Sequence, residues 1–380
     1  MSILISAKKY DRTLLSIVMI LLIIGTVMIF SSSTNISMDK YGNGTFYFRR
    51  HLIRLGLGLT AMVAAMIIDY RILKKIAAPF MIVTIILLVL TKAVYLVEGN
   101  HSPARWLYFG SFALQTSDLA RFASIIYLAT YIDRKRDRIK DFTYGFLPPV
   151  VITGLIMALI VIQPDFSTAA VIGLITIVML FMGGAKISHL IATASVSVAV
   201  MIPVLMAAHY RIERIKAYFD ASSNFLGTNY QVQQSLVSLG NGGVTGVGLG
   251  ESLGKNLFLP APHTDFILSI MGEEFGFIGI FLILTLFLAI FQRTIKISKE
   301  CTDVFGIMLG MALSIQLIIY AFINAAVVTG VVPTTGLPIP FISFGGTNLV
   351  VNLICIGIIL NISMAKRTVK HRKGARILFG

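Results

Sequence analysis

The sequence contains little charge, since only 13% of its 380 residues are Asp, Glu, Lys or Arg. Soluble chains carry roughly 25%, and a water-soluble fold of this length needs a charged surface. Hydrophobic residues make up 56% of the chain. They gather in runs of about 17 to 25, the length that crosses a bilayer as a helix. This composition excludes a soluble enzyme and a disordered chain, and the lack of strict alternation excludes an outer-membrane barrel.

Cysteine is also scarce, with only Cys301 and Cys355 present. Two cysteines indicate neither a disulfide framework nor a metal knuckle. The six histidines show no metal-ligand spacing, and no HExxH or Ser/His/Asp arrangement indicates hydrolysis. No repeat, linker or soluble domain interrupts the chain, so we expect one transmembrane domain over residues 1–380.

Ten apolar segments predict an all-α polytopic membrane protein with about ten transmembrane helices. The fourth segment is the weakest, because Ser117, Asp118 and Arg121 interrupt it. The segments cover roughly residues 14–30, 52–69, 76–95, 110–132, 145–162, 168–184, 187–207, 265–291, 304–329 and 344–363.

The basic residues predict the orientation of the chain. With the N-terminus inside, about twice as many Lys and Arg fall in inner segments as in outer ones, which favours cytoplasmic N and C termini and a basic cytoplasmic tail at 364–380. The net charge of +15 would indicate nucleic acid in a soluble protein. Here it fits inner loops that face anionic lipid, and we expect no nucleic-acid partner.

Polar and Pro/Gly-rich sequence gathers in the predicted outer segments. A large extracytoplasmic loop, 208–264, separates the seventh and eighth predicted helices, and residues 96–109 hold the single tryptophan, Trp106. The corner at 163–165 and the Pro-rich loop at 330–343 lie on the same side. This convergence predicts a site at the outer membrane surface that acts on a substrate held in the membrane.

Asp265 stands at the start of the eighth apolar segment, beside His263 and Thr264. A carboxylate near a helix N-terminus serves as a cap. At the membrane surface it also suits a general base that takes a proton from a sugar hydroxyl. Both interpretations remain open.

Glu273 and Glu274 lie deeper in the same segment. Adjacent carboxylates inside a span are costly and indicate either a functional relay or a structural ion pair. Arg54 and Arg121 are the intramembrane basic residues expected as their partners.

Three further features have a structural and a functional interpretation. Asp165 after Pro164 is either the cap of a helix–helix turn or part of a site. The glycine-rich stretch 240–250, followed by Lys255, is either a flexible re-entrant turn or a cradle whose amides bind a diphosphate. The Pro-rich string 332–346 is a rigid loop suited to walling a lipid groove.

The chain resembles the SEDS family of bacterial cell-wall proteins, of the FtsW/RodA type, over nearly its whole length. The glycine-rich loop through Lys255 and the Gly-Glu-Glu string resemble FtsW, the division member, more than RodA, the elongation member. The matching strings are Asp11-Arg-Thr-Leu-Leu15, Ala104-Arg-Trp-Leu107, Gln163-Pro-Asp-Phe-Ser-Thr-Ala169, Asn229-Tyr-Gln-Val-Gln-Gln-Ser235, Leu259-Pro-Ala-Pro-His-Thr-Asp-Phe266, Gly272-Glu-Glu-Phe-Gly276 and Pro333-Thr-Thr-Gly-Leu-Pro-Ile-Pro-Phe-Ile-Ser-Phe-Gly-Gly346.

The resemblance implies a peptidoglycan glycosyltransferase that polymerises lipid II in the bacterial inner membrane during division or elongation. By position, Asp265 matches the family's catalytic base. Substrate-binding roles are implied for a set of outer residues: Arg105, Trp106, Asp165, Lys255, His263 and Ser343. An intramembrane network is expected from Asp118, Arg121, Glu273 and Glu274.

Three positions depart from the family pattern. The string Gln115-Thr-Ser-Asp-Leu-Ala-Arg121 replaces the usual Gln-Pro-Ser-Glu-x-x-Lys, which keeps the charges but loses the proline. Thr335 stands where many FtsW-like members have lysine, and Ser167 replaces a common glycine. None of these removes the expected base.

The resemblance also implies a partner, a class B penicillin-binding protein, among other divisome or elongasome membrane proteins. The donor diphosphate needs cationic stabilisation. Lys255, Arg211, Arg214 or Arg105 would supply it, or a divalent cation (Mg²⁺ or Mn²⁺) held by Asp165 and Asp265. Two other functions stay open: a lipid II flippase, and a noncatalytic scaffold for a transpeptidase.

Overall fold

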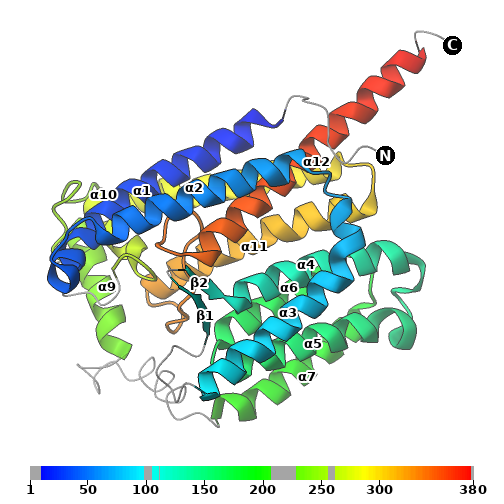
Figure 1. The fold of residues 1–380 in the computed structure, drawn as a ribbon, viewed down its shortest axis with the longest axis horizontal. Helices are drawn as coiled ribbons and strands as arrows, with labels where there is room; N and C mark the ends of the chain where they lie inside the picture. The colour runs from blue at the N-terminus through cyan, green and yellow to red at the C-terminus, as the bar shows by residue number, and fades with distance from the viewer. Residues whose placement is uncertain (1–9, 98–104, 111, 207–227, 256–261, 378–380) are drawn as a thin grey trace.

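The computed structural model describes residues 10–97, 105–110, 112–206, 228–255 and 262–377. They form a helical molecule with a short β-hairpin (Figure 1). The elements are, in chain order, α1 Arg12–Tyr41, α2 Phe46–Ile67, α3 Ile72–Val97, β1 Trp106–Phe109, β2 Phe112–Gln115, α4 Thr116–Lys135, η1 Arg136–Arg138, η2 Phe142–Phe146, α5 Leu147–Ile162, α6 Phe166–Met182, α7 Ile187–Met206, α9 Thr228–Gly242, α10 Ile267–Lys299, α11 Val304–Val328 and α12 Thr347–Ile377.

Each of the ten predicted apolar segments coincides with a helix. Among the described residues, seven helices are long and apolar enough to cross a bilayer: α1, α2, α3, α5 together with η2, α10, α11 and the first part of α12. α6 and the first part of α7 are apolar but shorter. The chain is therefore an integral membrane protein, and the total of ten spans remains a prediction.

The fourth helix begins later than its predicted segment, 110–132. Residues 112–115 form β2, which pairs antiparallel with β1, so that α4 starts at Thr116. α4 packs against α3, α6 and α11, and both Asp118 and Arg121 are buried. Protein rather than lipid surrounds the polar residues that weaken its hydropathy.

Figure 1 shows the helices in two groups. One holds α1, α2, α10, α11 and α12, with α2 packed along α12 and α1 along α10; the other holds α3 to α7. α4 and α11 are in contact where the groups meet. The start of α1 and the end of α12 lie at the same end of the molecule, as an even number of spans requires.

α10 is interrupted near its start, although its sequence predicts a continuous span. Gly276 has φ 67° and ψ −168°, outside the helical region. The glycine-rich segment crosses α10 at this break, where a Cβ on Gly276 would lie 2.4 Å from the Gly246 nitrogen. Four backbone hydrogen bonds join the two segments: Val247 N–H to Glu273 O, Gly248 N–H to Glu274 O, Phe277 N–H to Gly243 O and Ile278 N–H to Val244 O, at 2.9, 3.1, 2.9 and 3.2 Å.

These bonds pair the peptide groups that the break in α10 releases, which is required where no water is at hand. The glycine-rich segment belongs to the predicted loop 208–264. Of this loop, the structure describes α9, the residues that follow α9 up to 255, and residues 262–264. α9 packs against α10. Arg211 and Arg214, two of the expected cations, lie outside the described residues.

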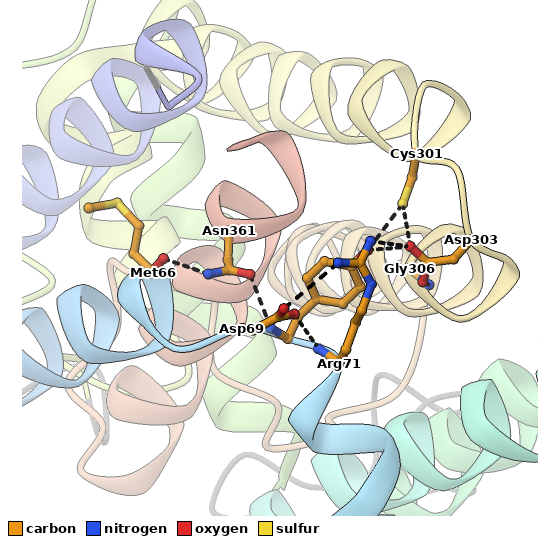
Figure 2. Close-up of polar contacts among 8 residues, drawn as sticks. Met66, Asp69, Arg71, Cys301, Asp303, Gly306 and Asn361 are labelled. Carbon is orange, nitrogen blue, oxygen red and sulfur yellow. Dashed lines mark hydrogen bonds and ion pairs between the residues drawn. The ribbon is translucent and has the colours of Figure 1, made fainter. Parts of the chain in front are cut away.

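At the predicted cytoplasmic side, one polar network ties the α2–α3 junction to the α10–α11 junction and to α12 (Figure 2). The Tyr70 hydroxyl donates to the Asp303 carboxylate, and the Arg71 guanidinium donates to the same oxygen at 3.1 Å. Asn361 of α12 accepts from the Tyr70 N–H at 3.1 Å and donates to the Met66 carbonyl at 2.6 Å. Three separate segments are thereby fixed at one point.

Candidate active site

Asp265 lies in the turn that leads into α10, and its side chain is half-buried. Asn324 of α11 donates its amide to the Asp265 carbonyl at 2.9 Å and to the Leu337 carbonyl at 2.8 Å. A Cβ on Gly336 would lie 3.7 Å from the Asp265 Oδ2 atom. α11 and the Pro-rich loop thus define the position of this carboxylate.

Asp265 stands just outside the first turn of α10. α10 begins at Ile267, and the N-cap residue is Phe266, which makes no side-chain capping bond. The carboxylate stands one residue before the cap.

Ser343 connects the Pro-rich loop to the residues that precede Asp265. Its hydroxyl donates to the Thr264 carbonyl at 2.7 Å and accepts from the Ile339 N–H at 3.0 Å. The Phe344 N–H donates to the His263 carbonyl at 2.9 Å. Ser343 therefore holds two backbone segments together, beside its implied role at the substrate.

His263 is buried between aromatic rings. Its ring centroid lies 4.6 Å from that of Tyr47 and 5.4 Å from that of Phe344. Burial, and then the nearby Lys40 ammonium, lower the pKa of the His263 imidazole to about 4. His263 is therefore neutral at physiological pH, and it adds no positive charge next to Asp265.

Arg54 was expected to pair with the intramembrane glutamates, and the structure places it elsewhere. Its guanidinium lies 4.7 Å from the centroid of the Phe344 ring, in contact range of Gly346. Arg54 thus belongs to the surroundings of His263 and Phe344, a position that no local sequence signal indicates.

Asp165 is a helix cap, the structural one of its two predicted interpretations. It caps α6 by accepting from the Thr168 N–H at 3.4 Å. It also accepts from the Ser117 hydroxyl at 2.8 Å and lies 3.9 Å from the Arg105 guanidinium. Arg105 also donates to the Pro164 carbonyl at 2.5 Å. The Gln-Pro-Asp corner, the hairpin and the start of α4 therefore converge on one buried carboxylate.

The β1–β2 hairpin is bonded to the start of α12. Trp106 opposes Gln115 in the β1–β2 register. The Gln115 N–H donates to the Thr347 hydroxyl at 2.9 Å, and that hydroxyl donates to the Ala113 carbonyl at 3.3 Å. Thr347 is the first residue of α12 and directly follows the Pro-rich loop. It therefore links the hairpin, which contacts Asp165, to the loop that contacts Asp265.

Glu273 organises the glycine-rich segment instead of pairing with an arginine. Its carboxylate accepts from the Ser252 hydroxyl at 2.5 Å and from the N–H groups of Leu253 and Gly254 at 3.2 and 3.1 Å. Asn241 donates to it at 3.4 Å. The charge is compensated by a set of loop donors.

Glu274 binds the lysine that follows that segment. It accepts from the Ser31 hydroxyl at 2.7 Å and lies 3.3 Å from the Lys255 ammonium. Lys255 also donates to the Gly250 carbonyl. It lines a cavity of about 410 Å³ between α1 and the glycine-rich segment. Arg54 and Arg121 were the candidate partners of the two glutamates. Within the described residues, neither arginine forms an ion pair with them, so this pairing was wrong.

Arg121 is fully buried and pairs within its own helix. It lies 3.2 Å from the Asp118 carboxylate, and its guanidinium is 4.2 Å from the centroid of the Tyr320 ring. Asn348 donates to the Asp118 carboxylate at 3.1 Å, and Asn352 donates to Asn348 at 2.7 Å. Asp118 and Arg121 thus form a network with α11 and α12 that is separate from the two glutamates.

The predicted residues therefore fall into four places. Asp265, His263 and Ser343 lie together; Asp165, Arg105 and Trp106 form a second group; Lys255 and the glutamates form a third, and Asp118 with Arg121 a fourth. Among the described residues, no three His, Cys, Asp or Glu side chains gather as metal ligands. A divalent cation between Asp165 and Asp265 remains a prediction.

Comparison with known proteins supports the resemblance found in the sequence. The profile of the FtsW/RodA/SpoVE family, described as "Cell cycle protein", matches residues 11–368. A protein of Trichlorobacter lovleyi named "Probable peptidoglycan glycosyltransferase FtsW" is 37% identical over 355 residues, 93% of each chain. "Stage V sporulation protein E" of Bacillus subtilis is 35% identical, covering 94% of this chain and 98% of its own.

Two solved structures share the fold. One, titled "Structural coordination of polymerization and crosslinking by a peptidoglycan synthase complex", has a TM-score of 0.75 at 23% identity and covers 94% of this chain and 98% of its own. Thermus thermophilus RodA has a TM-score of 0.68 at 22% identity, with coverage of 94% and 97%. The chain belongs to the FtsW/RodA/SpoVE family of cell cycle proteins.

Proposed function

We propose that the protein is a peptidoglycan glycosyltransferase that polymerises lipid II. Its relatives at 35–37% identity include several named as FtsW glycosyltransferases. The observation that carries the proposal is the placement of Asp265. A half-buried carboxylate stands at a helix start, with its backbone held by Asn324 and by the Pro-rich loop.

The proposed reaction is an inverting displacement. The Asp265 carboxylate takes the proton from the 4-hydroxyl of the acceptor GlcNAc, and that oxygen attacks C1 of the donor MurNAc. The bond from C1 to the diphosphate oxygen breaks, and undecaprenyl diphosphate leaves with the bonding electrons. Positioned general bases contribute typically 10²- to 10⁴-fold to rate.

The leaving diphosphate needs positive charge. Of the four cations expected from the sequence to supply it, Lys255 and Arg105 are among the described residues. Lys255 lines the cavity beside α1 but pairs with Glu274, so its charge is partly compensated. Arg105 is one-third exposed, and it lies near the Asp165 carboxylate. Both would orient an anionic group through a charge-assisted hydrogen bond.

We also propose a penicillin-binding protein partner. A structural relative with a TM-score of 0.75 comes from a synthase complex that couples polymerisation with crosslinking. A multi-pass location in the bacterial inner membrane, with both termini in the cytoplasm, follows from the basic residues and belongs to the same proposal.

The test is polymerisation of labelled lipid II by the purified chain with a class B penicillin-binding protein that lacks glycosyltransferase activity. We expect glycan ladders from the native chain and none from Asp265→Ala or Asp265→Asn. Asp39→Ala, an exposed carboxylate near the end of α1, is the matched control and should retain activity.

Ladders from Asp265→Ala at the native rate would remove Asp265 as the base. No ladders from native protein that is folded and bound to its partner would favour the flippase or the scaffold. A lipid II flipping assay in proteoliposomes would then separate these two.

A further inference from the structure

A cavity of about 680 Å³ lies at the opposite end of α10 from Asp265. Asp265 precedes α10, whereas the cavity borders the turn that follows it. It is enclosed by the end of α4 with the connection 136–140, by the α6–α7 turn at 182–184, and by residues 302–308 at the start of α11. Three helix ends therefore surround it on the predicted cytoplasmic side. It shares no lining residue with the proposed active site.

The cavity is lined by both charged and apolar side chains. Arg136 and Lys140 line it with exposed side chains, and within the described part of the chain neither forms an ion pair. Asp137 is the carboxylate among the lining residues. Ile132 and Ile139 are buried in its wall. The site therefore combines two cations and one carboxylate, a net positive charge, with several apolar side chains.

This combination suits an amphiphile with a phosphate ester. A soluble anion would use the two cations and leave the apolar wall uncovered, whereas a phospholipid covers both. The cavity also lies where helices end, beside the predicted cytoplasmic connections. Basic pockets between transmembrane helices on the cytoplasmic side bind anionic headgroups in this way.

We propose that this cavity binds the headgroup of an anionic phospholipid of the inner leaflet, with Arg136 and Lys140 on the phosphodiester. The lipid would join the α4–α5 connection to the start of α11. It is a site separate from the glycosyltransferase chemistry, and the proposal does not rest on that function.

The experiment is native mass spectrometry of the full chain, titrated with phosphatidylglycerol or with phosphatidylcholine. The variant is the double substitution Arg136→Gln/Lys140→Gln. We expect the native chain to retain phosphatidylglycerol in preference to phosphatidylcholine. The variant should bind phosphatidylglycerol roughly 10- to 30-fold more weakly, the effect of losing two cationic contacts to an anionic lipid surface.

The matched control is Lys135→Gln/Arg138→Gln, which removes the same charge from the same connection outside the cavity lining. It should bind as the native chain does. A second variant, Met308→Trp, fills the cavity without changing charge and should also lose the lipid. Unchanged melting temperatures establish that the variants are folded.

Two results would overturn the proposal. Equal losses from the lining and the control pair would mean that general surface charge, not the cavity, attracts the lipid. Displacement of the lipid by inorganic phosphate in excess would identify a soluble phosphate as the ligand and remove the lipid assignment.

Discussion

Asn324 and Asp265 lie 59 positions apart, and a single amide joins them, since the Asn324 side chain donates to the Asp265 carbonyl at 2.9 Å. The same amide donates to Leu337 in the Pro-rich loop at 2.8 Å. One side chain of α11 therefore fixes two segments that flank the proposed base. Both bonds go to backbone carbonyls, so the role assigned to Asn324 is to position these segments.

Replacing Asn324 with leucine should lower both stability and activity. The carbonyls of Asp265 and Leu337 would lose their shared donor, and an unsatisfied buried acceptor costs about 1–3 kcal/mol. We expect a melting temperature several degrees lower and a polymerisation rate at least tenfold lower, because a displaced base loses its alignment. Thermal unfolding in detergent and a lipid II polymerisation assay would measure the two effects.

Gln316→Leu is the matched control for this substitution. Gln316 is the other buried amide of α11, and it donates to Asn352, away from Asp265. It should reduce stability while polymerisation at a permissive temperature stays near the native rate. Equal activity losses in both variants would show that Asn324 acts only through general stability.

Glu273→Gln should loosen the glycine-rich segment. The carboxylate accepts from Ser252, Leu253 and Gly254, and an amide in its place would turn one acceptor oxygen into a donor facing other donors. Hydrogen bonds to a charged group contribute about 1.5–3 kcal/mol each. We expect faster hydrogen–deuterium exchange over residues 241–254.

The control for this change is Glu251→Gln, an exposed carboxylate on the same segment. Its exchange pattern should match that of the native chain. If the exchange rates of residues 241–254 are the same in Glu273→Gln as in the native chain, the glutamate is not needed to hold the segment. The backbone hydrogen bonds to α10 around Gly276 would then be sufficient.

The apolar runs predicted the helices correctly, because the mean hydropathy of a span is calculated from the residues of that segment alone. The interruption of α10 was missed, since Gly276 is one of three glycines between residues 272 and 279 and nothing local singles it out. Its cause is the segment near Gly246, about 30 positions earlier, which supplies the replacement hydrogen bonds. The late start of α4 has a similar origin, because β2 is defined by its pairing with β1.

The proposed site was predictable as a set of polar residues on one side of the membrane. Its partners were not, because they come from distant helices. Arg54 contacts Phe344, and Glu274 pairs with Lys255, which no spacing rule indicates. Asn324 had a usable signal, since a polar side chain inside an apolar span has a partner as a rule.

Gly25→Ala should displace the Pro-rich loop. A Cβ at this position of α1 would lie 2.5 Å from the Phe341 carbonyl oxygen and 2.7 Å from the Ile342 Cα. Phe341 has φ 66°, so the loop is already in a costly conformation and has little room to adjust. We expect polymerisation to fall at least tenfold, together with a lower melting temperature. Gly56→Ala in α2, where the added methyl meets open space, should change neither.

The Asp303 network predicts a stability that depends on pH. Burial alone would raise the pKa of the Asp303 carboxyl, but hydrogen bonds from Tyr70 and the Gly306 N–H, with the Arg71 charge, hold the pKa below its ordinary value. A lowered folded-state pKa stabilises the fold above the unfolded-state pKa, about 3.9, and this contribution is lost as pH falls through the folded-state pKa. The difference in melting temperature between native protein and Asp303→Asn, measured from pH 7 to pH 2, should therefore be largest at neutral pH and narrow as pH falls below about 4. A constant difference across that range, or the same convergence in the exposed Asp39→Asn variant, would contradict this assignment.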